Sequence, residues 1–271
     1  MHRRTLEGEL FANKRLLWLF TLRELRARYA GSFLGIFWSV IHPLIMLALY
    51  IIVFSTLVPR TGRLPFRSTT AEYTVFLCPA LIAWNWFQES LLGATNSITA
   101  NAAVIRKTVF PISILPAIPL TASFVAFSVS LMAFLLFLSF LGHFAWIVLV
   151  WLILLALIQA ALCIGPAYFL ATINVFVRDT GQLIFAVFQI LFWSTPVVYP
   201  PEAITKSFPA AEWWFRLNPM ARLIDAYREV ILLHRSPSLE TLLYLMIWII
   251  ISYHAGRSAF MHGRKHFADE V

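Results

Sequence analysis

Hydrophobic residues occur along this chain in long, nearly uninterrupted runs, and shorter polar or basic stretches separate them. A helix needs about 20 apolar residues to cross the ~30 Å hydrocarbon core of a bilayer, and the first four runs reach that length. The last two are shorter. The pattern predicts an all-α polytopic membrane protein with six transmembrane helices, at residues 33–58, 73–95, 114–141, 144–173, 183–199 and 239–254.

Composition supports lipid as the solvent. Of the 271 residues, 60% are hydrophobic and only 13% are charged, whereas a soluble domain is nearer one half and one quarter. The net charge of +8 comes from basic residues that lie mostly outside the apolar runs, which favours anionic lipid headgroups over nucleic acid as their partner. Cys78 and Cys163 each lie within an apolar run, so we interpret them as packing residues rather than as a disulfide or metal site.

The distribution of Lys and Arg predicts the orientation in the membrane. Six spans place both termini on one side, and thirteen of the 21 basic residues fall on that side. Because cytoplasmic loops carry an excess of Lys and Arg, we expect cytoplasmic N- and C-termini. Three arginines in the loop after the first run, Arg60, Arg63 and Arg67, oppose this bias without reversing it.

The N-terminal segment, residues 1–30, has the pattern of an amphipathic helix. Its apolar residues recur at helical spacings, and its basic residues fall to one side of them. This indicates an interfacial helix lying on the cytoplasmic leaflet, with a soluble leader as the alternative. The apolar stripe comprises Phe11, Trp18, Leu22, Leu25 and Tyr29, and the flanking cations are Arg15, Arg23 and Arg26.

The junction with the first span combines two small residues with a helix breaker. Gly31 and Gly35 are four residues apart, which allows close helix approach or, alternatively, a flexible joint. His42-Pro43 is expected to kink the span and free a carbonyl, which lipid tolerates only if that carbonyl faces protein or a wet path. We therefore expect this stretch to shape the cytoplasmic entry of a channel.

Two segments outside the spans are predicted to form short helices. Residues 101–109 can make two helical turns before Pro111 stops them, with an ordinary loop as the alternative. In residues 200–238, Asn218-Pro219 is a helix start, because Pro is favoured at the first helical position. A free external loop is the alternative for this second segment. The apolar face expected after Pro219 comprises Leu223, Tyr227, Val230, Ile231 and His234.

The sequence lacks the motifs of an enzyme site. No two of the ten glycines have the spacing of a phosphate-binding loop, and no HExxH, CxxC or GxSxG motif occurs. Glu89 is the main ionisable residue within a predicted span. A carboxylate is costly in lipid and therefore a functional candidate, unless it lies near water or pairs with a basic residue.

Aromatic residues make up 15% of the chain and are frequent on the first, second and fifth predicted spans. Such rings can stack on sugars and still let them slide, although lipid-facing bulk and interfacial belts are the alternative interpretation. The candidate translocation path comprises Phe37, Trp38, His42, Tyr50, Trp84, Trp86, Glu89, Phe188 and Phe192.

Four stretches in order along the chain carry a family likeness. They resemble the permease subunits of type-2 ATP-binding cassette exporters of polysaccharides and polyol phosphates. The O-antigen export permeases are the most similar, and the capsule and teichoic acid export permeases are also similar. The stretches are RYAGSFLGIFWSVIHPL (28–44), NAAVIRKTVFP (101–111), VRDTGQLIFAVFQILFWSTPVVYP (177–200) and LNPMARLIDAYREVIL (217–232).

The resemblance implies a transporter permease, not an enzyme, in the bacterial inner membrane. It implies a homodimer of six-span subunits resting on two separate ATP-binding subunits, which would hold ATP and Mg²⁺, so that this chain needs no cofactor of its own. The implied cargo is an undecaprenyl-diphosphate-linked polysaccharide that enters from the cytoplasmic side through surrounding membrane lipid.

The resemblance also implies roles for particular residues. A coupling helix that docks on the ATP-binding subunit would contain Asn101, Val104, Ile105, Arg106 and Lys107. An interface helix would contain Trp18, Arg23, Arg26, Arg28 and Tyr29. A periplasmic gate would contain Asn218, Pro219, Arg222, Asp225, Tyr227 and Arg228.

Other functions stay open from the sequence. A related permease could export drugs or another lipid-like substrate. An ion-coupled carrier would show more ionisable residues within several spans, and a membrane enzyme would show clustered carboxylates or a metal site.

Overall fold

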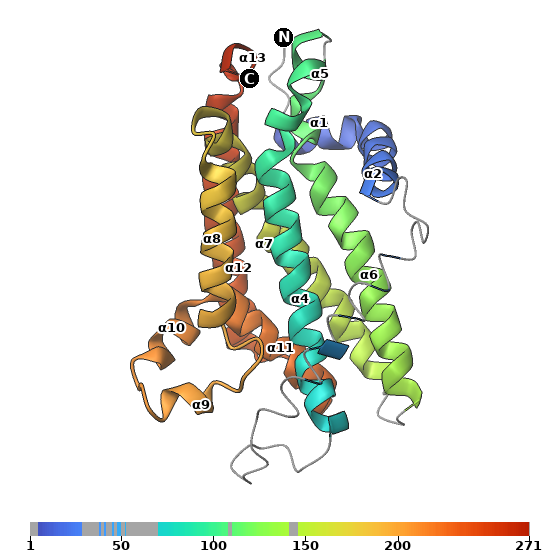
Figure 1. Cartoon of the computed structure of the whole chain (residues 1–271), viewed down its shortest axis with the longest axis vertical. Helices are drawn as coiled ribbons and strands as arrows, with labels where there is room; N and C mark the ends of the chain where they lie inside the picture. Colours follow the sequence, from blue (N-terminus) through green and yellow to red (C-terminus); the bar gives the residue numbers. More distant parts are fainter. Residues whose placement is uncertain are drawn as a thin grey trace.

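A computed structural model describes residues 5–28, 70–107, 110–140 and 146–270, and the isolated helical positions 38, 41, 45, 48, 49 and 52. Within this part of the chain every regular element is a helix (Figure 1). The elements are α1 (Leu6–Ala12), α2 (Lys14–Arg28), α4 (Thr70–Ser97), η2 (Thr99–Asn101), α5 (Ala102–Lys107), η3 (Ile112–Ile114), α6 (Ala117–Phe140), α7 (Trp146–Phe176), α8 (Thr180–Ser194), α9 (Glu202–Thr205), α10 (Ala211–Leu217), α11 (Pro219–Leu233), α12 (Leu239–Gly263) and α13 (Phe267–Glu270).

The long helices form one elongated bundle. α7 packs against α12 on one side and α4 on the other, and α4 in turn packs against α6 and α8. Helices α1, α2, α5 and α13 gather at the end of the bundle that also holds both chain termini, which we call the terminal end (Figure 1). Helices α9, α10 and α11 lie at the opposite end.

The described helices fit a polytopic membrane protein, the fold class that the sequence predicts. Three of them are long and apolar enough to cross a bilayer: Ile112–Phe140, Val148–Phe176 and Leu239–Gly263. α8 is apolar but shorter, and α4 is as long as these but less hydrophobic on average than α6, α7 or α12. Most of the first predicted span lies outside the described residues, so the count of six spans stays a prediction.

Two predicted boundaries are corrected. The fifth apolar run was expected to continue to Tyr199, but α8 ends at Ser194 because Pro196 pushes the preceding Thr195 into an extended conformation. The sixth was expected to end at His254, but α12 continues for more than two further turns to Gly263. In the last turns of α12, Arg257 pairs with Glu7 of α1, and Phe260 lies in an apolar cluster with Leu6.

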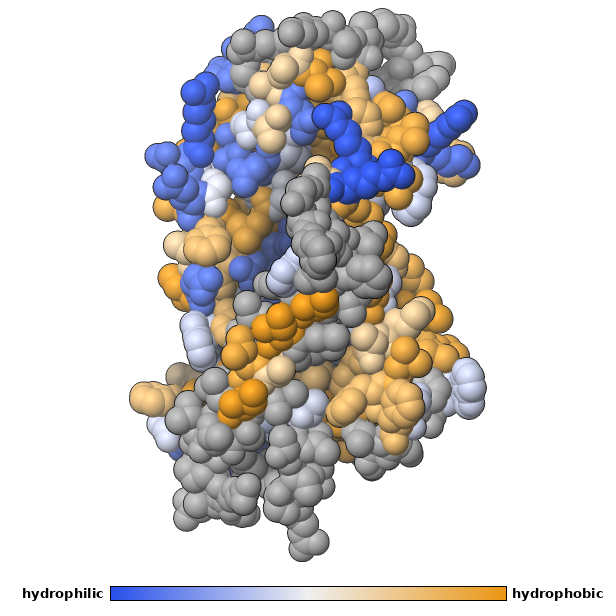
Figure 2. Space-filling view, turned by 45° about the vertical axis from the view of Figure 1, so that its right-hand side comes forward, coloured by the Kyte–Doolittle hydropathy of each residue, from blue (hydrophilic) through white to orange (hydrophobic). Residues whose placement is uncertain are grey.

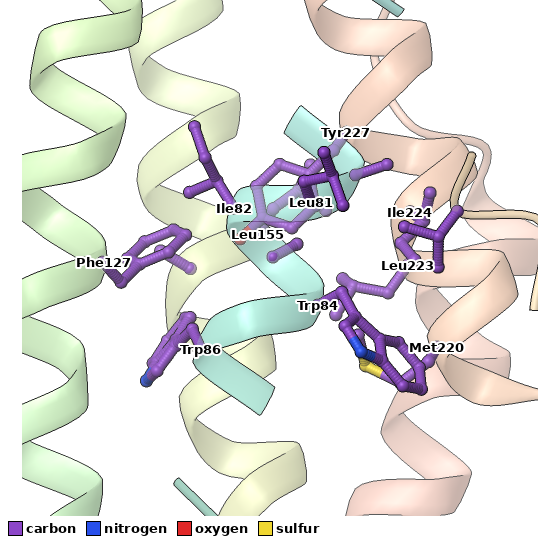
Figure 3. Close-up of a cluster of buried hydrophobic side chains, with 14 of the residues drawn as sticks. Leu81, Ile82, Trp84, Trp86, Phe127, Leu155, Met220, Leu223, Ile224 and Tyr227 are labelled. Carbon is purple, nitrogen blue, oxygen red and sulfur yellow. The ribbon is translucent and has the colours of Figure 1, made fainter. Parts of the chain in front are cut away.

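The hydrophobic core lies where α4, α7 and α11 meet. Leu81, Leu155 and Leu223 are almost fully buried there, and Trp84 packs beside them toward α11 (Figure 3). Large apolar side chains also cover the outside of the bundle, among them Ile153 and Leu157 on α7. This outward apolar surface is what a helix needs when its solvent is hydrocarbon.

Hydrophilic residues gather at the terminal end on the face shown in Figure 2, whereas hydrophobic residues dominate the bundle below it. This division fits a bundle whose terminal end meets water and whose middle meets lipid. The charged residues of α1 and α2 contribute to this hydrophilic end.

Glycine sets the closest contact between two helices. A Cβ atom built on Gly165 in α7 would overlap the backbone of Ser252 in α12, and one built on Gly256 would overlap the carbonyl of Gly165. The two backbones therefore touch, as in small-residue contacts between membrane helices, where the gain comes from van der Waals packing. No other residue type fits at either position without moving the helices apart.

We predict that Gly165→Ala destabilises the fold, because its methyl group must separate α7 from α12. Overpacking of this kind costs about 1–3 kcal/mol, or roughly 2–12 °C in the midpoint of thermal unfolding. Thermal unfolding of the detergent-purified protein measures the shift. Gly8→Ala is the matched control, since a Cβ there would meet only the Thr5 hydroxyl at an ordinary 3.4 Å. Equal midpoints for the two variants would contradict the proposed backbone contact.

Candidate functional site

The predicted helix between the second and third spans is present. α4 continues through η2 into α5, which projects from the terminal end (Figure 1). Asn101 donates its side-chain amide to the Ser97 carbonyl at 2.8 Å, which ties the start of this segment to α4. The helix is confirmed over Ala102–Lys107, whereas the side chains of Arg106 and Lys107 lie outside the described part.

An apolar cluster holds this projecting segment to the bundle. Ile105 is buried in it, Val104 is half-buried beside it, and Phe267 of α13 is fully buried on its other side. The Tyr168 hydroxyl donates to the Ser113 carbonyl at 2.6 Å, which fixes α7 to η3 just behind it. The cluster comprises Leu6, Ile98, Ile105, Ile114, Leu115, Ile118, Tyr168, Ala171, Val175, Phe260 and Phe267.

Both ends of the chain contribute to this cluster, which the sequence analysis did not anticipate. Glu9 of α1 pairs with Arg264 at 3.0 Å, and Glu7 pairs with Arg257 at 3.8 Å and also accepts a hydrogen bond from Tyr253. Two acidic residues on α1 thus face basic residues on α12. The sequence shows acidic residues near one end of the chain and basic residues near the other. Its local spacing does not indicate that these two distant segments pair.

The N-terminal segment departs from the predicted single stripe. Asn13 breaks it into α1 and α2, so a stripe drawn as one continuous helix is wrong. In α2, Leu25 and Thr21 face α6, and the Thr21 hydroxyl lies 2.6 Å from that of Thr121. Phe11 and Trp18 point outward. Arg23 and Arg26 are exposed, Tyr29 lies outside the described residues, and the interface role stays a prediction.

Glu89 is not an isolated carboxylate. Its Oε1 lies 2.6 Å from Nη1 of Arg28, and Nε of Arg28 lies 3.5 Å from Oε1 of Glu24. The Glu89 side chain is 49% exposed. Of the alternatives open from the sequence, pairing with a basic residue is the one that the structure supports. The pair pins the end of α2 to the middle of α4.

The aromatic candidates on α4 and α8 fall into two separate groups. Trp84 packs edge-on against Phe188 and Phe192, with ring centroids 6.2 and 5.7 Å away. Trp86 instead stacks on Phe127 of α6 at 4.3 Å. Trp84 and Trp86 therefore lie on different faces of α4, because two residues along a helix span about 200° (Figure 3).

Most of the described aromatic candidates are buried inside the chain. Trp84, Trp86, Phe188 and Phe192 are all buried within the single chain, where they contact protein. Trp38 is 36% exposed, whereas Phe37, His42 and Tyr50 lie outside the described residues. The assignment of all these residues to a cargo path stays a prediction.

At the opposite end, the predicted helix start at Asn218-Pro219 is confirmed. The Asn218 side chain caps α11 by accepting from the backbone N–H of Met220 at 2.9 Å, and it donates to the Thr195 hydroxyl at 2.8 Å. Four residues of the predicted apolar face, Leu223, Tyr227, Val230 and Ile231, are buried. The fifth is a correction.

His234 does not continue the apolar face of α11. It adopts a left-handed conformation with φ of 52° and ends the helix, so its side chain is turned out of the helical register and is exposed. Arg222, at the other end of α11, pairs with Glu240 at 3.0 Å and lies over the ring of Tyr244. These contacts join α11 to the start of α12.

Arg228 is the most constrained side chain at this end, with only 6% of its surface exposed. Its guanidinium donates to the carbonyls of Pro196 at 2.8 Å, Val197 at 2.7 Å and Phe76 at 3.3 Å. It also lies 3.7 Å from the centre of the Phe76 ring and 3.4 Å from the half-exposed carboxylate of Asp225. One side chain thus joins α11, α4 and the turn after α8.

The guanidinium keeps its charge in this setting. Burial lowers the pKa of Arg228 to about 10, and the neighbouring Asp225 carboxylate opposes that shift. The group is therefore protonated at neutral pH, which allows all of its N–H groups to donate. Within the described ranges no three His, Cys, Asp or Glu side chains gather as a metal site.

Comparison with known proteins places these features in a family context. The family model described as ABC-2 type transporter matches residues 15–232, which is most of the chain. An O-antigen export system permease protein RfbA from Myxococcus xanthus is 29% identical over 264 residues, covering 97% of this chain and 98% of that protein. A protein of the same name from Klebsiella pneumoniae is 32% identical over 216 residues, covering 79% of each chain.

We predict that Arg228→Met destabilises the fold strongly, because it leaves buried carbonyl oxygens without donors. Each unsatisfied buried group costs about 1–3 kcal/mol, so a total loss of roughly 3 kcal/mol or more is expected. Thermal unfolding or protease resistance of the purified protein measures it.

Arg216→Met is the control for this substitution. Arg216 is 66% exposed and pairs only with Glu212 one helical turn away, an interaction worth less than about 1 kcal/mol. If both variants unfold at the same temperature, Arg228 does not hold the opposite end together.

Proposed function

Because the chain belongs to the ABC-2 type transporter family, we propose that it is the membrane subunit of an ATP-driven exporter in the bacterial inner membrane. The proposed cargo is a lipid-linked polysaccharide of the O-antigen type, moved from the cytoplasmic side. The observation that carries this proposal is the end-to-end similarity to an O-antigen export permease, over 97% of this chain and 98% of the relative. A capsule, teichoic acid, drug or lipid exporter permease is the alternative within the same family.

The energy source in this proposal is a separate pair of ATP-binding subunits, one beneath each copy of a permease homodimer. The sequence supports this division of labour, since its ten glycines include no phosphate-binding loop. ATP and Mg²⁺ would then be bound by the partners. α5 is the proposed contact, because it projects beyond the bundle at the terminal end and carries Arg106 and Lys107.

Movement in the proposed cycle begins at α5. The apolar cluster around Ile105 and Phe267 connects α5 to α7, α12 and α13. A force on α5 would therefore be transmitted to these helices instead of being absorbed by a flexible loop. At the opposite end, α11 is the proposed gate. Arg228 links it to both α4 and the turn after α8, which lets rearrangement of those helices reach the exit.

The proposed cargo path runs along surfaces between the two copies of the chain. An undecaprenyl diphosphate carrier would approach through lipid at α2, where Arg23 and Arg26 are exposed and could bind phosphate oxygens. Aromatic rings on that path would stack on the sugars as the polymer slides. The buried rings of Trp84 and Phe192 would join it only if α4 and α8 separate.

Reconstitution tests the proposed function. The chain is placed in vesicles with its proposed ATP-binding subunit, and transport of an undecaprenyl-diphosphate-linked polysaccharide is followed with and without ATP. Transport that needs ATP is expected. Transport that continues without ATP but stops when the ion gradient collapses would replace the exporter with an ion-coupled carrier.

We predict that the double charge reversal Arg106→Glu/Lys107→Glu abolishes export, because it turns the proposed docking helix from basic to acidic. Co-purification of the ATP-binding subunit and stimulation of its ATPase activity should fall together. Lys206→Glu/Arg235→Glu is the matched control, with two exposed cations reversed beyond the opposite end of the bundle. Unchanged export in the first variant would mean that Arg106 and Lys107 do not contribute to docking.

We predict opposite phenotypes for two tryptophans among the path candidates. Trp38→Ala should slow export with little change in stability, because the ring is partly exposed. Trp84→Ala should instead lower stability by about 3–5 kcal/mol, since it empties a core position. Export rate and thermal unfolding are measured on both variants. Normal export by Trp38→Ala would favour the lipid-belt interpretation of that ring.

A further inference from the structure

A buried asparagine joins three segments of the chain at the terminal end. Asn174 lies near the end of α7 and is 3% exposed. Its Nδ2 donates to Oδ1 of Asn96 at 3.3 Å and to the Thr99 hydroxyl at 3.4 Å, while its Oδ1 accepts from the backbone N–H of Gly181 at 3.1 Å. A single amide therefore contacts the end of α4, the start of η2 and the first turn of α8.

Steric contact reinforces these hydrogen bonds. A Cβ atom built on Gly181 would lie 2.8 Å from Oδ1 of Asn96, so α8 begins in direct contact with the end of α4. Thr99 also donates its hydroxyl to the Asn96 carbonyl at 3.1 Å, which holds η2 in the same arrangement. We call Asn96, Thr99, Asn174 and Gly181 the asparagine joint.

The joint lies between the projecting segment and a helix that is exposed along one face. On one side, η2 leads directly into α5. On the other side, α8 exposes Leu183, Phe185, Ile190 and Trp193, so among the described residues α8 packs on the bundle along one face. A helix held along one face can shift more cheaply than α7, which is packed against both α4 and α12.

We propose that Asn174 is a positioning residue that transmits displacement of η2 and α5 to α8. The inference rests on the proposed function, since it assumes that an ATP-binding subunit moves α5. Its physical basis is that an amide buried among apolar helices must keep its hydrogen bonds, because an unpaired polar group there is costly. When Thr99 and Asn96 move, Asn174 and the N–H of Gly181 move with them.

Two variants break the joint from different sides. Asn174→Leu removes all three side-chain hydrogen bonds and keeps a side chain of similar shape. Gly181→Ala puts a methyl group 2.8 Å from Oδ1 of Asn96, so the Asn96 side chain must turn away and release its bond with Asn174. Thr172→Val is the matched control: it is also buried near the end of α7, but its hydroxyl donates only to the Tyr168 carbonyl of the same helix. All three are prepared as the full complex with the ATP-binding subunits.

The decisive readout is the conformation of α8 rather than activity. Val187→Cys places a thiol on the exposed face of α8, and its rate of reaction with a maleimide is measured with and without trapped nucleotide. The native Cys78 and Cys163 are buried and compete little for the reagent. Polysaccharide exported per ATP hydrolysed is measured in parallel on the same variants without the added cysteine.

Wild type and Thr172→Val should show a nucleotide-dependent change in the labelling rate. Asn174→Leu and Gly181→Ala should lose that change, and their export per ATP should fall by about fivefold or more while the complex stays assembled. A wild-type difference that persists in Asn174→Leu would overturn the inference. So would a lower yield of assembled complex with normal export per ATP in the complex that does assemble, which would make Asn174 a packing residue only.

The same experiment separates failure of this inference from failure of the proposed function. If the wild-type complex hydrolyses ATP and exports polysaccharide but labelling at position 187 ignores nucleotide, the joint does not drive α8 and the exporter stands. If the wild-type complex neither hydrolyses ATP nor transports, the proposed function fails and this inference fails with it.

Discussion

The guanidinium of Arg228 is the interaction on which the opposite end of the bundle depends. α8 ends at Ser194 because Pro196 follows, and the non-helical turn after it has carbonyl oxygens with no partner in a helix. Away from water such groups need donors from elsewhere. Arg228 supplies them to Pro196 and Val197, and its third bond reaches Phe76 on α4, three residues before Pro79 interrupts that helix's own bonding.

α12 contacts the helices at both ends of the bundle. Near its start, Glu240 pairs with Arg222 and the Tyr244 hydroxyl donates to the Leu217 carbonyl, so α12 is registered against α10 and α11. Near its end, Arg257 and Arg264 pair with α1. Between these points its backbone touches that of α7 at Gly165 and Gly256. The glycine contact therefore holds α7 and α12 close together between the two ends of the bundle.

The sequence predicts the elements of this fold better than their partners. Apolar run length locates α6, α7 and α12, and Asn218-Pro219 locates the start of α11, because both signals depend on neighbouring residues alone. What the sequence leaves undetermined depends on distant segments. Nothing near Trp84 and Trp86 reveals which helix each ring will meet, and nothing near Arg228 reveals the carbonyls at Pro196 and Val197. The break at Asn13 was missed because the apolar spacing on either side of it happens to continue one stripe.

For the candidate site, too, the sequence predicts the local helix but not the distant residues that pack on it. The helix of α5 follows from its local sequence and from Pro111, whereas the cluster that supports Ile105 draws on α1, α7, α12 and α13. That support matters for any movement that begins at α5. α7 is in backbone contact with α12, and α4 packs against α6, α7 and α11, whereas α8 packs along one face among the described helices, so α8 is the proposed element that moves. α8 is also the helix whose far end leads into the carbonyls held by Arg228. The asparagine joint holds the first turn of α8, and Arg228 holds the carbonyls just after its last turn, so α8 connects the terminal end with α11.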